Sequence, residues 1–360
     1  MGKENRVRGK LSYVEILRTG TAIISSLAIV CVIVFFISSE PAAAMTNFLT
    51  GPLSSVRRMG NVVEAAVPLM FTGLAVMLLQ RAGLFNLAME GAFFIGAAVA
   101  AAVSLSLPLP AALNLFLSCA AGAIAGAVVC GIPTVLKVKC ESSVLVTSLM
   151  LNYICMYIGL YLIINFFQDP QMNSNYSYPF QEGVAFTNLF PRTRINSGII
   201  VCALCVFLIW LLLNKTSYGY KVTMVGKNAA MAKYSGMNIG RLVIGSSLIG
   251  GLLAGLGGAV DLFGMYPRFQ YSGLTGYGWD GILIAIVARQ KAQYVPLAAL
   301  FLAYLRIGAD VMSIHSDIPS EMIKIIQAIV IILISAQAIL SGYKKKLIIQ
   351  EARENEKEAA

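Results

Sequence analysis

The chain has 360 residues, of which 58% are hydrophobic and 12% are charged, and its formal net charge is +10. Soluble domains carry about 25% charged residues, so this composition excludes one and predicts a multi-pass membrane protein. The basic residues do not gather on one face, which excludes nucleic-acid binding and attributes the positive charge to membrane topology.

Ten apolar stretches predict an all-α fold with ten transmembrane helices, each near the length of about 20 residues that a span needs. The eighth stretch is short and carries Asp280, and the second contains Glu64 and Pro68, so eight spans is the alternative. We interpret the first stretch as an uncleaved span, because its apolar run of about 18 residues exceeds that of a signal peptide. The expected spans lie near residues 20–38, 61–80, 88–105, 110–131, 143–165, 197–213, 241–261, 276–289, 293–311 and 321–341.

The distribution of basic residues supports this topology. With the amino terminus inside, the cytoplasmic segments hold 20 of the 27 lysines and arginines, and the outer segments hold five. This bias follows the positive-inside rule and predicts that both termini are cytoplasmic. We therefore expect a cytoplasmic segment (1–19), a transmembrane domain (20–341) and a cytoplasmic tail (342–360). The polar, aromatic outer loop 165–196 is expected to cap the outer mouth.

Residues 72–97, "TGLAVMLLQRAGLFNLAMEGAFFIGA", interrupt the apolar pattern with polar groups. Asn86 and Glu90 lie one helical turn apart, on one face near the start of a span. Polar residues inside a membrane are costly, so such a pair indicates either an interhelical hydrogen bond or a lined cavity. The two interpretations stay open at this stage.

Residues 225–241, "VGKNAAMAKYSGMNIGR", predict a short, soluble helix between two spans. Asn228 is a suitable N-cap, Ala229 to Tyr234 mostly favour a helix, and Gly236 can end it. At 1.5 Å per residue this helix is about 10 Å long, too short to cross a membrane. It lies in the expected cytoplasmic loop 214–240, where it either contacts a partner or lies on lipid.

Residues 270–290, "QYSGLTGYGWDGILIAIVARQ", contain four glycines that favour irregular backbone. At membrane depth such backbone is tolerated only where protein or a water-filled cavity covers it. Trp279 and Asp280 follow these glycines. The pair could stack on and hydrogen-bond a polar ring compound, or anchor a helix end at the membrane interface.

The sequence contains no set of residues that predicts catalysis, and we expect no enzymatic activity, cofactor or metal site. It contains no phosphate-binding loop of the form G-x-x-x-x-G-K-[ST]. Cys202 and Cys205 form a CxxC inside an apolar run, which favours core packing over redox or zinc chemistry. The single histidine, His315, has no neighbouring metal-ligand pattern.

Four motifs in order resemble the permease subunits of sugar and nucleoside ABC importers, the group allied to the ribose and branched-chain amino acid permeases. They are the 72–97 stretch, "VTSLMLNYI", the 225–260 stretch and "YGWDGILIAIVARQ". The resemblance covers about residues 60–341 and is strongest to the nucleoside-type permeases. The turn "ARQKAQ" departs from the family by two extra positive charges, which we interpret as a contact to the ATPase or to acidic lipid.

The resemblance implies a multi-pass protein of the bacterial cytoplasmic membrane that works with a separate ABC ATPase, which uses the ATP. It also implies a second permease subunit, usually a different chain, and a lipoprotein substrate-binding protein. The helix between the spans is then the ATPase-coupling helix. The implied substrate-path residues are Asn86, Glu90, Asn152, Trp279 and Asp280, and the implied coupling residues are Gly226, Lys227, Asn228, Ala229, Ala230, Met231, Ala232, Lys233, Tyr234 and Gly236.

Two alternatives to nucleoside import stay open. One is a pentose importer of the same architecture. The other is a stand-alone secondary transporter driven by protons or sodium, in which Glu64, Glu90 and Asp280 would be the coupling groups.

Overall fold

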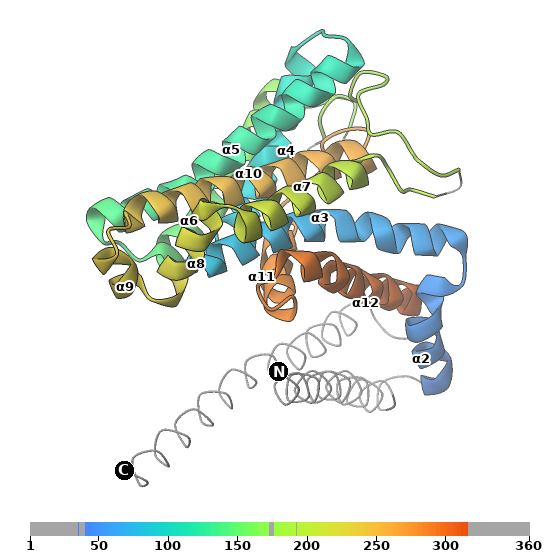
Figure 1. Ribbon diagram of the computed structural model, residues 1–360. Helices are drawn as coiled ribbons and strands as arrows, with labels where there is room; N and C mark the ends of the chain where they lie inside the picture. The colour runs from blue at the N-terminus through green and yellow to red at the C-terminus, as the bar shows by residue number, and fades with distance from the viewer. Residues whose placement is uncertain (1–34, 36–39, 173–175, 192, 316–360) are drawn as a thin grey trace, which may run out of the picture. The chain divides into compact units, whose positions relative to one another are not determined.

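The computed structural model describes residues 35, 40–172, 176–191 and 193–315. These residues form helices joined by turns and loops, with two isolated β-bridges in the loop before α7 (Figure 1). The α-helices are α2 (Pro41–Thr50), α3 (Val56–Arg81), α4 (Met89–Ser106), α5 (Ala111–Cys140), α6 (Val144–Phe166), α7 (Gly198–Lys215), α8 (Ser217–Lys227), α9 (Ala229–Tyr234), α10 (Ile239–Met265), α11 (Tyr277–Val287) and α12 (Val295–His315).

Seven helices in the described part of the chain are long and apolar enough to cross a membrane: α3, α4, α5, α6, α7, α10 and α12 with the 3₁₀ turn before it. They correspond to seven of the ten expected spans and confirm the prediction of an all-helical, multi-pass protein. The expected spans 20–38 and 321–341, and the terminal segments 1–19 and 342–360, lie outside the described residues. The count of ten and the side of both termini stay predictions.

The eighth expected span, 276–289, does not form a full transmembrane helix. Helix α11 has 11 residues and is therefore about 16 Å long, roughly half the hydrocarbon thickness. The preceding residues 266–276 are irregular and end at Gly276, whose φ of 83° suits glycine. This glycine-rich sequence starts the helix late, which corrects the expectation.

The irregular segment and α11 together still connect the two ends of the bundle. Near the end of α10, the Phe186 amide donates to the Phe263 carbonyl at 3.1 Å. At the other end, the Arg81 Nε donates to the Gln290 carbonyl at 2.9 Å, beside the C-terminus of α3. The chain therefore runs from one end of the bundle to the other between α10 and α12, with only half of that path helical.

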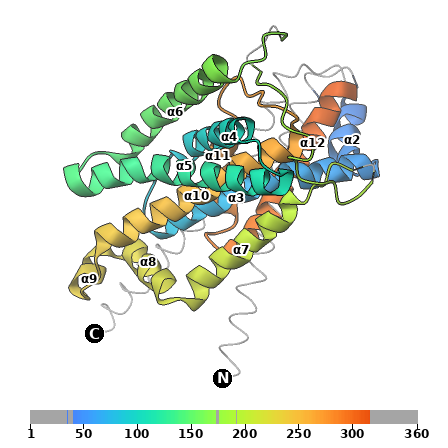
Figure 2. The ribbon, with the colours of Figure 1, turned by 90° about the horizontal axis from the view of Figure 1, so that it is seen from above.

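Helix α10 packs along α5, α4 and α3 and forms the centre of residues 55–303 (Figure 2). Its contact with α5 depends on glycine: a Cβ at Gly126 would overlap the Gly251 carbonyl oxygen, and one at Gly255 would overlap the Gly122 carbonyl oxygen. Small residues allow such close approach of membrane helices. These glycines are therefore packing residues.

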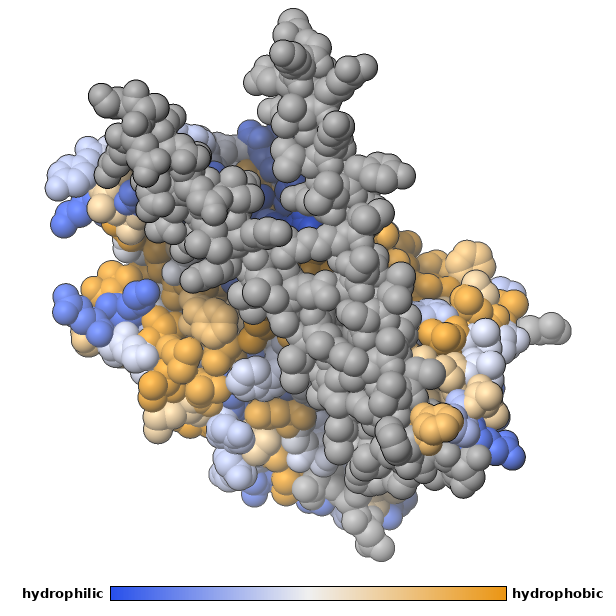
Figure 3. All heavy atoms as spheres, turned by 90° about the horizontal axis from the view of Figure 1, so that it is seen from below, coloured by the Kyte–Doolittle hydropathy of each residue, from blue (hydrophilic) through white to orange (hydrophobic). Residues whose placement is uncertain are grey.

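Helices α3 and α4 are mostly enclosed, whereas α6 and α7 are mostly exposed. In the most hydrophobic part of each helix, 89% of α3 is buried but only 22% of α6 and of α7. Orange, hydrophobic side chains occupy much of the coloured surface in the view of Figure 3. Cys202 and Cys205 are buried in α7, and the Cys202 sulfur lies 3.6 Å from that of Met70, which confirms core packing.

The described part of the other compact unit consists of residues 35, 40–54 and 304–315. Helix α2 was not predicted, because "PAAAMTNFLT" is too short for a span, although Pro41 suits the first turn of a helix. The Tyr304 hydroxyl donates to the Leu49 carbonyl, and Gly308 closely approaches the Phe48 carbonyl. The helix is therefore held by the second half of α12.

The loop between α6 and α7, predicted to lie outside, is bonded to the chain that follows α10. The amides of Ser177 and Phe180 donate to the carbonyls of Phe269 and Pro267 at 3.1 and 2.9 Å. Asp169 and Arg268 form an ion pair at 3.3 Å. The loop and residues 263–269 thus form one connected structure at this end of the bundle.

Candidate functional site

The polar residues around the start of α4 are held by hydrogen-bonding groups of α5, α10 and α6. The Asn86 side chain accepts from the Ala88 amide at 2.9 Å and donates to the Cys130 carbonyl at 3.1 Å and to the Ser247 hydroxyl at 3.3 Å. Cys130 lies on α5 and Ser247 on α10. Asn86 is 3% exposed in this chain. Its amide therefore orders the turn just before α4 and ties that turn to α5 and α10.

Helix α6 holds the same turn from the other side. The Asn152 side chain accepts from the Gly91 amide at 2.8 Å and donates to the Leu87 carbonyl at 3.0 Å. One turn earlier, the Ser148 hydroxyl accepts from the Leu87 amide at 3.1 Å. Ser148 was not among the predicted residues. It lies four residues before Asn152 in "VTSLMLNYI", and this spacing indicates that both side chains lie on one face of the helix.

Glu90 binds the N-terminus of α11. Its carboxylate accepts from the Gly276 and Gly278 amides, both at 2.6 Å, and from the Thr275 hydroxyl at 3.3 Å. The first amides of a helix have no partner within the helix, and α11 has no side-chain cap of its own. A carboxylate is favoured there by the helix dipole. Glu90 is 1% exposed, so this charge is held in a protein-lined site.

The approach of α4 to α11 requires glycine. A Cβ at Gly278 would lie 2.5 Å from the Glu90 amide nitrogen, and one at Gly91 would lie 2.8 Å from the Asn152 Oδ1. A ring contact adds to the junction, with the centroids of Phe93 and Tyr277 5.2 Å apart. The glycines expected to favour irregular backbone therefore also bring two helix N-termini together.

The structure thus brings together all five predicted path residues around the first turns of α4 and α11. Asn86, Glu90, Asn152 and Asp280 are all buried, with Asp280 in the first turn of α11. Trp279 lies next to Asp280 and is 46% exposed. Trp279 is therefore the member of the set that presents its ring at the surface of this chain, whereas the four polar side chains are enclosed.

The soluble helix of the loop before α10 has the caps that the sequence predicts. The Asn228 side chain accepts from the Met231 amide at 3.0 Å and so caps α9. Gly236 has a φ of 75°, and the Met237 amide donates to the Ala232 carbonyl at 3.0 Å, which closes the C-terminus in a Schellman motif. Helix α9 has six residues, from Ala229 to Tyr234.

One side of α9 is exposed and the other is packed. Tyr234 is 94% exposed and Met231 is 55% exposed, whereas Ala232 is buried. The flanking positions on the surface are Lys227, Asn228, Ala229, Ala230, Lys233 and Gly236. The helix therefore presents a large aromatic and a methionine side chain outward, both of which are enriched at protein interfaces.

The end of α8 rests on the turn that follows α3. A Cβ at Gly226 would overlap the Arg81 carbonyl oxygen, and one at Gly83 would lie 3.0 Å from the Gly226 Cα. Arg81 also bonds to Gln290 at the end of α11. The chain just before α9 is thus in close backbone contact with the turn that leads into Asn86 and Glu90. The Arg81 side chain in turn connects the end of α3 to Gln290, just after α11.

Comparison with known proteins gives full-length relatives. The guanosine ABC transporter permease protein NupP of Bacillus subtilis is 31% identical over 90% of this chain and 95% of its own length. The glucose ABC transporter permease protein TsgB13 of Haloferax volcanii is 30% identical over 89% of this chain and 87% of its own. The nucleoside ABC transporter permease protein NupB of Lactococcus lactis is 26% identical over 89% and 90%.

One solved structure shares a broad likeness with the chain. PsaBC from Streptococcus pneumoniae in complex with Fab aligns with 82% of this chain and 95% of that chain, at 14% identity and a TM-score of 0.45. This likeness is too distant to inform the site. Residues 58–335 match the family described as "Branched-chain amino acid transport system / permease component", and the chain belongs to this family of membrane-embedded ABC transporter permeases.

Proposed function

We propose that this permease carries a nucleoside inward as one of two different permease subunits, together with an ABC ATPase and a lipoprotein that binds the substrate outside. The observation that carries the proposal is the 31% identity, over nearly all of both chains, to a protein named as a guanosine permease. We propose ten crossings with both termini cytoplasmic, which places α9 on the ATPase side.

Helix α9 is suited to receive a movement from an ATPase. Its two caps fix both ends, and Tyr234 and Met231 project from its exposed side. A short helix whose outward side chains enter a groove is a common mode of recognition. Because Gly226 lies against Arg81, a displacement of α9 would pass to the turn between α3 and α4 and to the end of α11.

The proposed substrate path passes the first turns of α4 and α11. Glu90, Asn86 and Asn152 hold those turns in place, and the exposed Trp279 ring is available for stacking on a nucleobase. Asp280, in the same turn as Trp279, is the proposed hydrogen-bonding partner. The opposite wall of the path would come from the second permease.

A sugar is the second candidate substrate, because one relative of 30% identity is named as a glucose permease. Uptake of labelled guanosine, uridine, ribose and glucose by vesicles that contain the assembled transporter separates the two. A nucleoside importer takes up the first two only, and only with ATP. Uptake by this chain alone, driven by an ion gradient and abolished by an uncoupler, would instead support a secondary transporter.

The coupling role is tested by co-purification from detergent-solubilised membranes. Met231→Glu and Tyr234→Ala should each reduce the recovered ATPase at least several-fold, because they change exposed side chains without removing packing. The matched control is Phe116→Ala on α5, at 69% exposure and outside the coupling loop. If both loop variants retain the ATPase as the wild type does, α9 is not the coupling helix.

A further inference from the structure

The outward face of α6 carries a row of tyrosines. Tyr153, Tyr157 and Tyr161 are 58, 66 and 62% exposed. Their spacing of four residues places them on one side of the helix, with about 6 Å along the axis between neighbours. Asn165 is exposed and continues the row by one more turn. The row therefore extends over about 18 Å of a transmembrane helix.

Lipid is an unsuitable environment for this face. In the described part of the chain, the three hydroxyl groups have no hydrogen-bond partner. A hydroxyl group left without a partner in hydrocarbon is unfavourable, and membrane tyrosines gather instead near the water interface. Tyr153 is the tenth of the 23 residues of α6 and so lies near the middle of the span.

Helix α7 provides the contrast. It is as exposed as α6 in its most hydrophobic part, at 22% buried, but its exposed large side chains before the last two residues are all hydrocarbon. They are Ile200, Leu204, Phe207, Leu208 and Leu211. This helix therefore has the surface that lipid favours, whereas α6 adds the three tyrosines to exposed aliphatic side chains such as Ile154 and Ile158.

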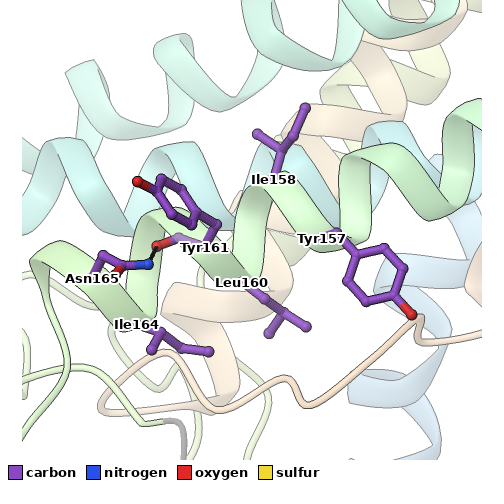
Figure 4. A pocket seen from close by; sticks show the side chains of 6 residues that line it. All are labelled: Tyr157, Ile158, Leu160, Tyr161, Ile164 and Asn165. Atoms are coloured by element: carbon purple, nitrogen blue, oxygen red, sulfur yellow. Dashed lines mark hydrogen bonds between the residues drawn. The ribbon is translucent and has the colours of Figure 1, made fainter.

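A shallow, open hollow lies beside the row. It is lined by residues of α6 alone: Tyr157, Ile158, Leu160, Tyr161, Ile164 and Asn165. Figure 4 shows the rings of Tyr157 and Tyr161 projecting from the helix. The surface that lines this hollow is almost entirely apolar, and none of its six side chains is charged. Such a surface suits a neutral solute.

We propose that the tyrosine row of α6 lines the substrate path and binds the planar heterocycle of a neutral nucleoside. The phenol rings stack on the base, and the hydroxyls and Asn165 hydrogen-bond its edge and its sugar. This inference rests on the proposed function and adds to it a site outside the α4–α11 junction. Neighbouring tyrosines let a base pass from one ring to the next along the span.

Water accessibility of the row tests this placement in the assembled transporter. Tyr157→Cys is made in a Cys140→Ser background, because Cys140 is an exposed native cysteine. The matched control is Phe207→Cys on α7. Tyr157 precedes the end of α6 at Phe166 by nine residues, and Phe207 follows the start of α7 at Gly198 by nine. Because one loop joins these ends, the two positions lie at similar depth.

A membrane-impermeant, hydrophilic maleimide should label Tyr157→Cys at least tenfold faster than Phe207→Cys, and guanosine with the binding protein should slow that labelling. Equal, slow labelling of both positions would place the row in lipid and overturn the proposal. Cross-linking of Tyr157→Cys to the second permease without protection by guanosine would make the row a subunit interface. If ribose but not guanosine protects Tyr157→Cys from labelling, the proposal that the row binds an aromatic heterocycle is overturned.

Transport provides a second readout. Tyr157→Phe keeps the ring and should lower the rate of ATP-driven guanosine uptake about three- to tenfold, the effect of one hydrogen bond. Tyr157→Ala should lower it further, and Phe207→Ala should leave it unchanged. Full activity of Tyr157→Ala would overturn the proposal. Absence of guanosine uptake by the wild type would instead refute the proposed function, and labelling would still show whether water reaches the row.

Discussion

Replacement of Glu90 by glutamine should loosen the start of α11 and impair transport. In the native protein both carboxylate oxygens accept amide hydrogens, from Gly276 and Gly278, each at 2.6 Å. Glutamine keeps one acceptor oxygen but turns an NH₂ group toward the other amide, and it removes the negative charge from the helix N-terminus. Charge-assisted hydrogen bonds contribute about 1.5–3 kcal/mol each, and the helix dipole about 0.3–1 kcal/mol. The expected loss of stability is therefore about 2–4 kcal/mol.

Thermal unfolding of the purified protein in detergent measures this loss, together with ATP-driven uptake in vesicles. Glu90→Gln should unfold several degrees below the wild type and transport at least tenfold more slowly. Glu182→Gln is the matched control, because Glu182 is exposed on the outer loop. If Glu90→Gln unfolds at the same temperature as Glu182→Gln, the carboxylate does not hold α11 and the reasoning is refuted.

Three further substitutions follow from the same contacts. Gly226→Ala places a methyl group against the carbonyl at the end of α3 and should reduce ATPase co-purification several-fold. Gly273→Ala is the control and should not, because its Cβ would meet an atom only at 4.0 Å. Equal recovery of the ATPase with both variants would contradict the importance of the Gly226 contact. Gln290 has a φ of 56°, so Gln290→Gly should raise the unfolding free energy by about 1 kcal/mol; a fall in melting temperature would contradict this. Asn152→Ala leaves a buried amide and a buried carbonyl at the start of α4 unpaired and should lower the free energy of unfolding by about 2–4 kcal/mol. Asn214→Ala, on the surface of α7, is the control and should leave it unchanged. Equal melting temperatures of the two variants would contradict the role of Asn152.

Much of the fold could be predicted because each transmembrane helix is determined by its own stretch of sequence. Backbone groups in lipid must be hydrogen-bonded within their own segment, so a long apolar run already implies a helix. The same holds for α9, since Asn228 and Gly236 cap it through bonds to residues within five positions. Pro68 does not interrupt α3, which is 26 residues long and continues past the proline to Arg81. The prediction of α11 as a full span failed because apolar residues alone do not show where a glycine-rich segment stops being helical.

The candidate site was predicted only as a set of separate polar residues. The sequence indicated Asn86, Glu90 and Asn152 because polar groups in apolar runs are costly, but it left open whether they bind each other or line a cavity. The structure shows that their hydrogen bonds are made within the chain, with Asn86 bonded to α5 and α10 and Asn152 bonded to α4. Ser148, Ser247 and Thr275 were not predicted as part of the site. Serine and threonine are uncharged and common in membrane helices, so their presence in an apolar run does not by itself indicate a site.

The sequence by itself determined that this protein is a multi-pass helical membrane protein with a short, capped helix between two spans, because composition, apolar length and capping act over short distances. Only the tertiary structure decided what each polar residue does. Glu90 bonds to Gly276, 186 residues away, and Asn86 bonds to Ser247, 161 residues away. No local pattern specifies such partners. They are set by the close packing of α10 on α5 and of α11 on α4, which brings these residues together.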